Sequence, residues 1–275
     1  MSALIIGALI GLILGLTGAG GSLLAVPLLM YGLDLPAQQA TGLALGSVAI
    51  AAIIGVIGRL KNRSILWQPG LVFALGGALF TPAGQWLAKQ LSETILLSSF
   101  ALLTFFIATR LWQQATRNPT AAAIIRADTS TNASNNSEPV CRFSASGQFE
   151  WRLPCIFRLM FAGISAGILS GLFGVGGGFL IVPMLIFLTQ VSMAQAVATS
   201  LLVISLISGT GFISSLANMN YSTVLLLLLG SGAAIGMLAG TVIGKKIAGA
   251  TLQKLFAILM LCSAALILYQ QIFAS

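Results

Sequence analysis

Two glycine clusters in this chain have the spacing of a backbone anion site. One lies in residues 11–29 and the other in residues 167–185, and both read Gly-xxx-Gly-Leu-x-Gly-x-Gly-Gly-xx-Leu-x-Val-Pro-x-Leu. Successive glycines allow several backbone N–H groups to point into one cavity, where they can hold a small anion. A helix that starts directly after such a loop adds the positive end of its dipole. The chemistry predicted here is anion binding without a charged side chain.

The predicted ligands are the glycine N–H groups and the hydroxyls that follow them. Hydroxyls of Ser and Thr can add donors, although in membrane helices they often bond only to their own backbone. Pro27 and Pro183 lie one to two turns into the helices after the clusters, where each frees a carbonyl, and we predict helix breaks there. The predicted substrate-binding residues are Gly18, Gly20, Gly21, Ser22, Thr41, Gly174, Gly176, Gly177, Gly178, Thr199 and Ser200.

The clusters belong to a longer internal duplication. Ten of the twenty positions in residues 11–30 are identical to those 156 residues later, and residues 39–43 resemble residues 197–201 at an offset of 158. Helix-breaking residues at corresponding places in two halves of a membrane protein point to a binding site between the halves. Close helix packing through small residues is the alternative. Packing explains Gly11 and Gly15 but not the runs of adjacent glycines.

The elements that position these clusters are predicted to be membrane helices. The chain has 275 residues, of which 57% are hydrophobic and 7% charged, and its mean hydropathy is +1.02. Soluble domains carry about 25% charged residues. Backbone groups in lipid must be satisfied internally, so long apolar runs of this kind must be helices. Residues 4–16 lack a basic flank and a cleavage site, so we expect them in the first span and not in a signal peptide.

Eight hydrophobic segments can be drawn, in two homologous groups of four. The first and fifth are near 30 residues long and contain the glycine clusters, so each is expected to bend strongly or to fold back on itself. The predicted fold class is an all-α polytopic membrane protein with two four-segment repeats. The segments cover roughly residues 3–31, 37–58, 65–88, 94–112, 158–188, 195–217, 222–244 and 252–273.

A polar stretch separates the two halves. Residues 113–157 are rich in Asn, Ser and Arg and are predicted to form a cytoplasmic linker with a disordered middle. Residues 1–112 then form the first transmembrane repeat, and residues 158–275 form the second. This division predicts two domains of similar architecture joined by a hydrophilic segment.

The orientation of the repeats depends on the first and fifth segments. If both cross the membrane fully, Lys89 and the lysines that follow residue 244 lie outside. If both fold back, the halves are inverted and only Lys89 stays outside, while the linker is cytoplasmic in either case. The excess of Lys and Arg expected on the cytoplasmic side favours the second arrangement.

Several other functions are disfavoured by the composition. The net charge of +8 comes from basic residues in loops and at span ends, with no basic helix, so it reports topology and not nucleic-acid binding. The chain has no His, and its five acidic residues lie at span ends or in the linker, which speaks against a proton relay. The same absence counts against an intramembrane hydrolase, because such an enzyme needs a base beside its nucleophile. The three cysteines show no C-x-x-C spacing, so no disulfide or metal framework is expected.

At these residues the chain resembles the sulfite exporter TauE/SafE family of bacterial inner-membrane permeases. The marks are the duplicated glycine motif ending in Val-Pro, and Ala-Thr-Gly-Leu at residues 40–43 with Ala-Thr-Ser-Leu at residues 198–201. The resemblance covers nearly the whole chain outside the linker. It implies transport of sulfite, sulfoacetate and other small sulfur-containing or organic anions. Ser22 stands where the second copy has Gly178, so the two half-sites need not be equivalent.

We therefore expect a secondary permease for a small anion, bound by the glycine-rich helix breaks where the two repeats meet. One repeat would rock against the other to alternate access. The alternatives are a non-transporting assembly or accessory subunit, in which the glycines only pack helices, and an anion channel. The expected partners are a small anionic substrate and the lipid bilayer, with no nucleic acid, and a homo-oligomer is compatible with the sequence. No enzymatic activity, cofactor or metal is expected.

Overall fold

The part of the chain described by the computed structural model is helical and contains no strand. It consists of residues 2–18, 21–60, 65–117, 153–174, 176–189, 193–216 and 222–244, together with residues 258, 261 and 265. The helices are α1 (Ser2–Thr17), α2 (Gly21–Leu33), α3 (Ala37–Leu60), α4 (Trp67–Gln90), α5 (Glu93–Arg117), α7 (Leu153–Phe173), α8 (Gly178–Thr189), α9 (Met193–Leu216) and α10 (Thr223–Gly244).

Five of these helices are long and apolar enough to cross a bilayer. They are α3, α4, α7, α9 and α10, and α3 and α9 are the most deeply buried of them. The helices α1, α2 and α8 are shorter than the roughly 20 residues that a span needs. The chain is thus a multi-pass helical membrane protein. The count of eight segments stays a prediction, because segment 252–273 lies mostly outside the described residues.

The predicted linker is shorter at both ends than its sequence suggested. Helix α5 continues to Arg117 and α7 begins at Leu153, so both reach into the range 113–157 that was assigned to the linker. The start of α7 is apolar and reads Leu-Pro-Cys-Ile-Phe, whereas α5 extends through the largely polar residues Gln-Gln-Ala-Thr-Arg. The predicted disordered middle lies outside the described residues.

Helices α1 and α2 form a hairpin. A Cβ placed on Gly21, at the start of α2, would lie 2.3 Å from the carbonyl oxygen of Ile10. Near the end of α2, a Cβ on Gly32 would lie 2.6 Å from Cδ1 of Ile6. Later residues of α2 therefore meet earlier residues of α1, so α2 runs back along α1. In the same way α8 follows the next glycine turn and packs against α7.

Glycines allow α1 and α10 to pack backbone against backbone. A Cβ on Gly11 would lie 1.9 Å from the carbonyl oxygen of Ala233, and one on Gly236 would lie 2.0 Å from that of Ala8. No larger residue fits at these distances, and close approach through small residues is what drives helices together in lipid. The residue numbers of the contacting pairs increase together along both helices, so α1 and α10 are parallel. They pair Gly7 with Leu229, Gly11 with Ala233 and Gly15 with Met237.

The same arrangement recurs between α7 and α4. A Cβ on Gly167 of α7 would lie 2.2 Å from the carbonyl oxygen of Gly77 on α4. In the other direction, a Cβ on Gly84 of α4 would lie 2.2 Å from the carbonyl oxygen of Ile168 on α7. These helices are also parallel. The contacts pair Gly163 with Phe73, Gly167 with Gly77 and Gly171 with Thr81, each 156 residues from a contact of α1 with α10.

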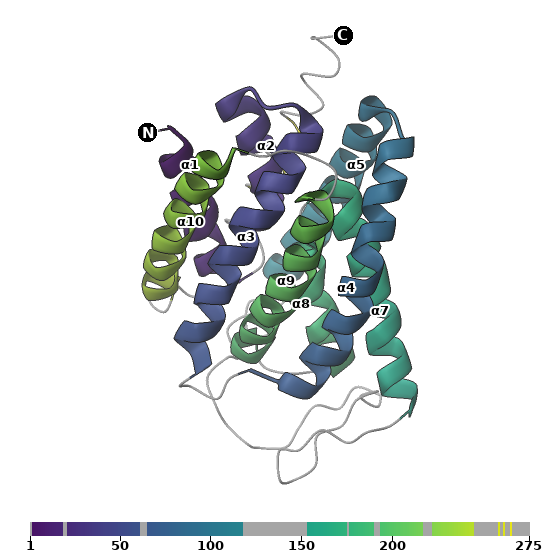
Figure 1. Cartoon of the computed structure of the whole chain (residues 1–275). Coiled ribbons are helices and arrows are strands. Elements are labelled where there is room, and N and C mark those ends of the chain that lie inside the picture. The colour runs from purple at the N-terminus through teal and green to yellow at the C-terminus, as the bar shows by residue number, and fades with distance from the viewer. Residues whose placement is uncertain are drawn as a thin grey trace.

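The helices α3 and α9 occupy the centre of the molecule and run antiparallel. Gly55 of α3 lies against Leu201 of α9, and Gly46 lies against Phe212. Figure 1 shows the pair between α1 and α10 on one side and α4 and α7 on the other. Both helices begin and end 156 residues apart. The register of 158 that the sequence similarity suggested for this region is therefore not the one that the helix ends follow.

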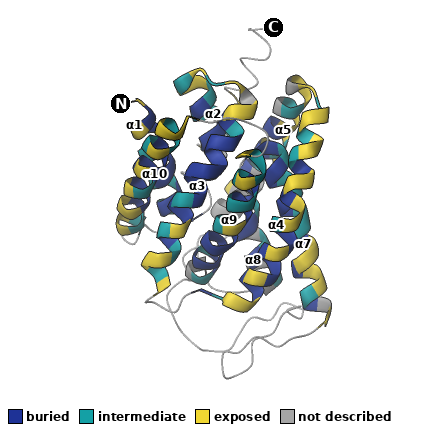
Figure 2. Ribbon diagram, viewed as in Figure 1, coloured by how far each residue is buried: buried dark blue, intermediate teal, exposed yellow. Residues whose placement is uncertain are grey.

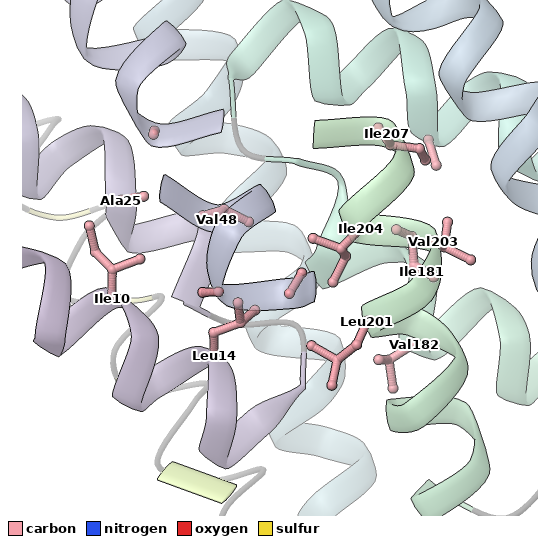
Figure 3. Packing of buried hydrophobic residues seen from close by; sticks show 14 of the residues in the cluster. Ile10, Leu14, Ala25, Val48, Ile181, Val182, Leu201, Val203, Ile204 and Ile207 are labelled. Carbon is pink, nitrogen blue, oxygen red and sulfur yellow. The ribbon is translucent and has the colours of Figure 1, made fainter. Parts of the chain in front are cut away.

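Burial follows this arrangement. The central helices are largely buried, whereas the outer helices carry exposed apolar side chains that suit contact with lipid (Figure 2). Leu79 of α4 and Leu102 of α5 are examples, with 73% and 75% of their surface exposed. The core cluster joins α1, α3, α8 and α9, as the side chains of Leu14, Val48 and Leu201 show in Figure 3.

One prediction about the cysteines is wrong. Cys155, which is fully buried near the start of α7, is disulfide-bonded. Its partner cysteine lies outside the described residues. Sequence spacing did not reveal the bond, because neither Cys141 nor Cys262 is close to Cys155 along the chain.

The glycine contacts predict a clear effect on stability. Gly11→Ala and Gly167→Ala each place a methyl group against a backbone carbonyl, so we expect a loss of about 1–3 kcal/mol, the usual cost of overpacking. The measurement is the midpoint of thermal unfolding of the purified protein in detergent. Gly58→Ala is the matched control, because a Cβ on Gly58 meets nothing within 4 Å and alanine favours helix. Equal stability of all three variants would contradict the close packing.

Candidate functional site

The first glycine turn connects α1 to α2 and begins at Gly18. This glycine has φ +71°, a conformation that other residues rarely adopt, and its N–H donates to the carbonyl of Leu14 over 2.7 Å. The hydroxyl of Ser200, on α9, donates to the carbonyl of Gly18 over 2.9 Å. Gly20, a predicted ligand, lies outside the described residues. The turn is thus fastened to the central helix of the second half.

The second glycine turn connects α7 to α8. Gly174, Gly176 and Gly177 have φ values of +68°, +68° and +64°, so each needs the freedom of glycine. The N–H of Gly174 donates to the carbonyl of Ser170, which mirrors the bond that starts the first turn. Three left-handed residues so close together prevent the helix from continuing. The helix breaks that were predicted at the two prolines are not present, because α8 continues through Pro183 and α2 continues through Pro27.

Each turn packs against the central helix of the opposite half. A Cβ on Gly18 would lie 2.2 Å from Cγ1 of Val197 on α9, and one on Gly174 would lie 2.1 Å from Cγ2 of Thr41 on α3. The residues of the two contacts are again 156 apart. Thr41, one of the predicted ligands, therefore lies at the second turn, and its role in binding stays a prediction. Both turns lie in the interior, between elements of both halves.

Two serines converge on Gly176. A Cβ on Gly176 would lie 2.5 Å from Oγ of Ser208, on α9, and 3.7 Å from Cβ of Ser22, at the start of α2. Both serines are fully buried. Ser22 was a predicted ligand, and its position brings the start of α2 to the turn that precedes α8. Val48 of α3 is the third neighbour, with its Cγ1 3.6 Å from the position of a Cβ on Gly176.

The start of α8 supplies backbone donors at the same turn that have no acceptor within their own helix. The carbonyl of Gly177 accepts the N–H groups of Leu180 and Ile181, over 3.0 and 3.2 Å, which marks Gly177 as the residue before the first helical turn. The N–H groups of the first residues of a helix have no acceptor within the helix. In α8 these donors are the backbone N–H groups of Gly178 and Phe179. Ser170 of α7 lies beside Gly177, with its Cβ 3.3 Å from the position of a Cβ on that glycine.

Two predicted ligands prove to have structural partners. Thr199 is fully buried, and its oxygen accepts the N–H of Leu66 over 3.0 Å, at the start of α4. Ser200 shares its single proton between the carbonyls of Gly18 and Val197. These bonds explain both residues as contacts that hold α9 to its neighbours, whereas their role in binding stays a prediction.

Sequence reasoning missed two hydroxyls at the second turn. The oxygens of Ser170 and Ser208 are buried and have no hydrogen-bond partner among the described residues. Each is one of two or more hydroxyl residues in a long apolar helix, where a bond to the helix's own backbone is the usual expectation. The signal that was available is their spacing: Ser170 precedes Gly174 by one turn and lies on its face of α7.

No charged side chain belongs to the helices that form the second turn, apart from Arg158. That residue lies near the start of α7, about 24 Å along the helix from Gly174. Helices α8 and α9 contain no ionisable residue. The positive potential at the turn therefore comes from backbone dipoles and hydroxyls alone.

Comparisons with known proteins show the family of the chain. The family described as sulfite exporter TauE/SafE matches residues 3–267. The chain is 26% identical to the probable membrane transporter protein YunE of Bacillus subtilis, over 98% of this chain and 97% of that protein. It is 30% identical to a probable membrane transporter protein of Xylella fastidiosa, over 72% of this chain and 67% of that protein. No solved structure is significantly similar to it.

The match extends over both glycine turns and all the described helices, and the relatives carry the name of membrane transporters. A polytopic helical chain with a buried cluster of backbone donors fits that description. The chain belongs to the sulfite exporter TauE/SafE family and is a multi-pass membrane transporter.

Proposed function

We propose that this protein is a secondary permease for a small anion in the bacterial inner membrane. The substrate class that fits best is a sulfur-containing oxyanion, an organosulfonate or a carboxylate, as the family description suggests. The observation that carries the proposal is the pair of buried glycine turns, each at the start of a short helix and each packed against the other half. The protein acts as a carrier and not as an enzyme.

The contacts support two inverted repeats of four segments each. The helices α3 and α9 occupy equivalent places in the two halves and run antiparallel, which a membrane-plane axis of symmetry requires. The hairpin of α1 with α2 makes the first segment re-entrant, so each half crosses an odd number of times. Carriers of this kind alternate access by moving one repeat against the other around a fixed site.

The alternative of a packing scaffold explains only part of the glycines. Gly11 and its neighbours on α1 contact carbonyls directly, as packing glycines should. Gly176 is different, because its nearest neighbour is a hydroxyl oxygen and its φ lies in the left-handed region. A scaffold does not need buried donors at this point. A channel is distinguished from a carrier by flux that does not saturate.

One face of the membrane collects the basic residues. The helices α3 and α10 are parallel, because Gly46 lies against Leu226 and Gly55 against Met237. Both end on one face, which is also where α4 and α7 begin. The positive-inside rule makes this face cytoplasmic and leaves Lys89 on the other. The basic residues in or next to these helix ends are Arg59, Lys61, Arg63, Arg152, Arg158, Lys245 and Lys246.

The permease proposal predicts saturable uptake that depends on Gly176. Proteoliposomes with the full chain are tested with sulfite, sulfate, thiosulfate, sulfoacetate and simple carboxylates. We expect at least one anion to be taken up, and Gly176→Ala to reduce its uptake by roughly tenfold or more, because the methyl group displaces the Ser208 hydroxyl and strains a left-handed residue. Gly209→Ala, next to Ser208 on α9 but with open space around its Cβ, is the control.

Two outcomes would count against the proposal. Absence of uptake for every anion by a folded protein would favour the accessory subunit. Equal losses of uptake and of thermal stability in Gly176→Ala and Gly11→Ala would show that both glycines serve packing only.

The sidedness predicts opposite labelling of two new cysteines. In a variant with its native cysteines replaced, Ser222→Cys, just before α10, should react with an impermeant thiol reagent in right-side-out vesicles. Ser134→Cys, in the linker, should react only after permeabilisation. The native orientation of the vesicles is checked with a periplasmic marker. Rapid labelling at position 134 in sealed vesicles would reverse the assignment.

A further inference from the structure

We propose that the second glycine turn alone holds the anion, that Ser208 and Ser170 bind it through their hydroxyls, and that the site selects singly charged anions. The inference rests on the proposed permease function and names the ligands and charge class of its site. The donors are the two hydroxyls and the N–H groups at the start of α8. It assigns to the first turn a structural role.

Ser208 and Ser170 differ from the other hydroxyl residues of their helices. On α9, Ser205 donates to the carbonyl of Leu202, and Ser200, Thr210 and Ser215 also bond to carbonyls three residues back. On α7, Ser165 donates to two carbonyls of its own helix. Ser208 and Ser170 make no such bond among the described residues, although both are fully buried.

A buried hydroxyl without a partner is costly, so its persistence calls for a partner in some other state. Both hydroxyls lie at one glycine turn, Ser208 against Gly176 and Ser170 beside Gly177. The turn leads directly into α8, a helix of 12 residues whose first N–H groups have no acceptor within the helix. Hydroxyl donors and a positive helix end meeting at one point form the donor set of a small anion.

The first turn has no equivalent of the Ser170 and Ser208 hydroxyls. Residues 156 earlier than Ser170 and Ser208 are Leu14 and Ala52, and both are buried and apolar. Ser22 also lies at the second turn, with its Cβ 3.7 Å from the position of a Cβ on Gly176, and its equivalent in the second half is Gly178, which has no hydroxyl. The first turn instead has its Gly18 carbonyl bound by Ser200. The asymmetry points to one site per chain.

The charge class follows from the absence of cationic side chains along α8 and α9 and in the glycine-turn half of α7. The desolvation cost of an ion in a medium of low dielectric rises with the square of its charge. Hydroxyls and the partial charge of a helix end, about half an elementary charge, offset the cost for one negative charge far better than for two. The site therefore favours hydrogensulfite, a sulfonate or a monocarboxylate over sulfate.

The test compares anions of equal shape and different charge. Proteoliposomes with the full chain are assayed with methanesulfonate and with sulfate, and with sulfite at pH 6 and pH 8, which shift it between its singly and doubly charged forms. We expect uptake of methanesulfonate but little of sulfate, and faster uptake of sulfite at pH 6. Ser208→Ala and Ser170→Ala should each reduce uptake roughly tenfold or more, the loss expected when a hydrogen bond to an ion is removed.

Matched variants separate binding from folding. Ser205→Ala and Ser165→Ala remove hydroxyls that bond within α9 and α7, and they should leave uptake within about twofold of the wild type. Because Ser208 and Ser170 have no partner without anion, their alanine variants should keep or raise the thermal stability of the empty protein. Ser200→Ala should lower that stability, since it releases the Gly18 carbonyl.

The outcomes of these experiments separate failure of the single-site inference from failure of the proposed permease function. Uptake of none of these anions at either pH, and none of thiosulfate, sulfoacetate or the simple carboxylates, would overturn both. Preference for sulfate over methanesulfonate, or wild-type uptake by Ser208→Ala and Ser170→Ala, would overturn the inference and leave a permease. Loss of stability in step with loss of uptake in these two variants would show that the serines serve packing only, and would also overturn it.

Discussion

The structure depends on how closely α1 approaches α10 and α7 approaches α4. In lipid, association of helices gains little from the hydrophobic effect, so it relies on packing of backbones at short range. Glycines at successive turns make that packing possible, with positions such as Gly11 and Gly167 where a Cβ would collide with a carbonyl. In both pairs the two helices come from opposite halves of the chain. The halves therefore hold each other together, and neither has a complete core alone.

The pairing of helices from opposite halves places both glycine turns in the interior, between the halves. A helix too short to span must end inside the protein, and its end groups must then find partners or line a site. Helices α1 and α2 meet this requirement by folding into a hairpin whose tip reaches the central helices. The tip of the second hairpin, at Gly176, reaches α9, α3 and the start of α2 at once. Packing glycines thus determine where the chain may break, and the breaks determine where polar groups can be buried.

Much of this fold could be predicted from the sequence, because apolar runs and adjacent glycines act locally. The helix ends at Thr17 and Phe173 follow from glycine conformation, which depends on a few neighbouring residues. The pairing of α1 with α10 could not be predicted, since it depends on which faces meet in space. The free hydroxyls were missed for the same reason: Ser208 and Ser205 look alike in sequence, and only the fold shows that one faces a glycine turn.

The two turns show how a duplicated fold can come to hold one site. Both need glycine, and both start from an N–H bond to the carbonyl one turn back, at Leu14 and at Ser170. They differ in what surrounds them. A hydroxyl has one proton to give, and Ser200 shares its proton between the carbonyl of Gly18 in the first turn and that of Val197 in its own helix. At the second turn the proton of Ser208 remains to be used. Equivalent backbones with unequal hydroxyls thus support the proposal of one anion site, at the second turn.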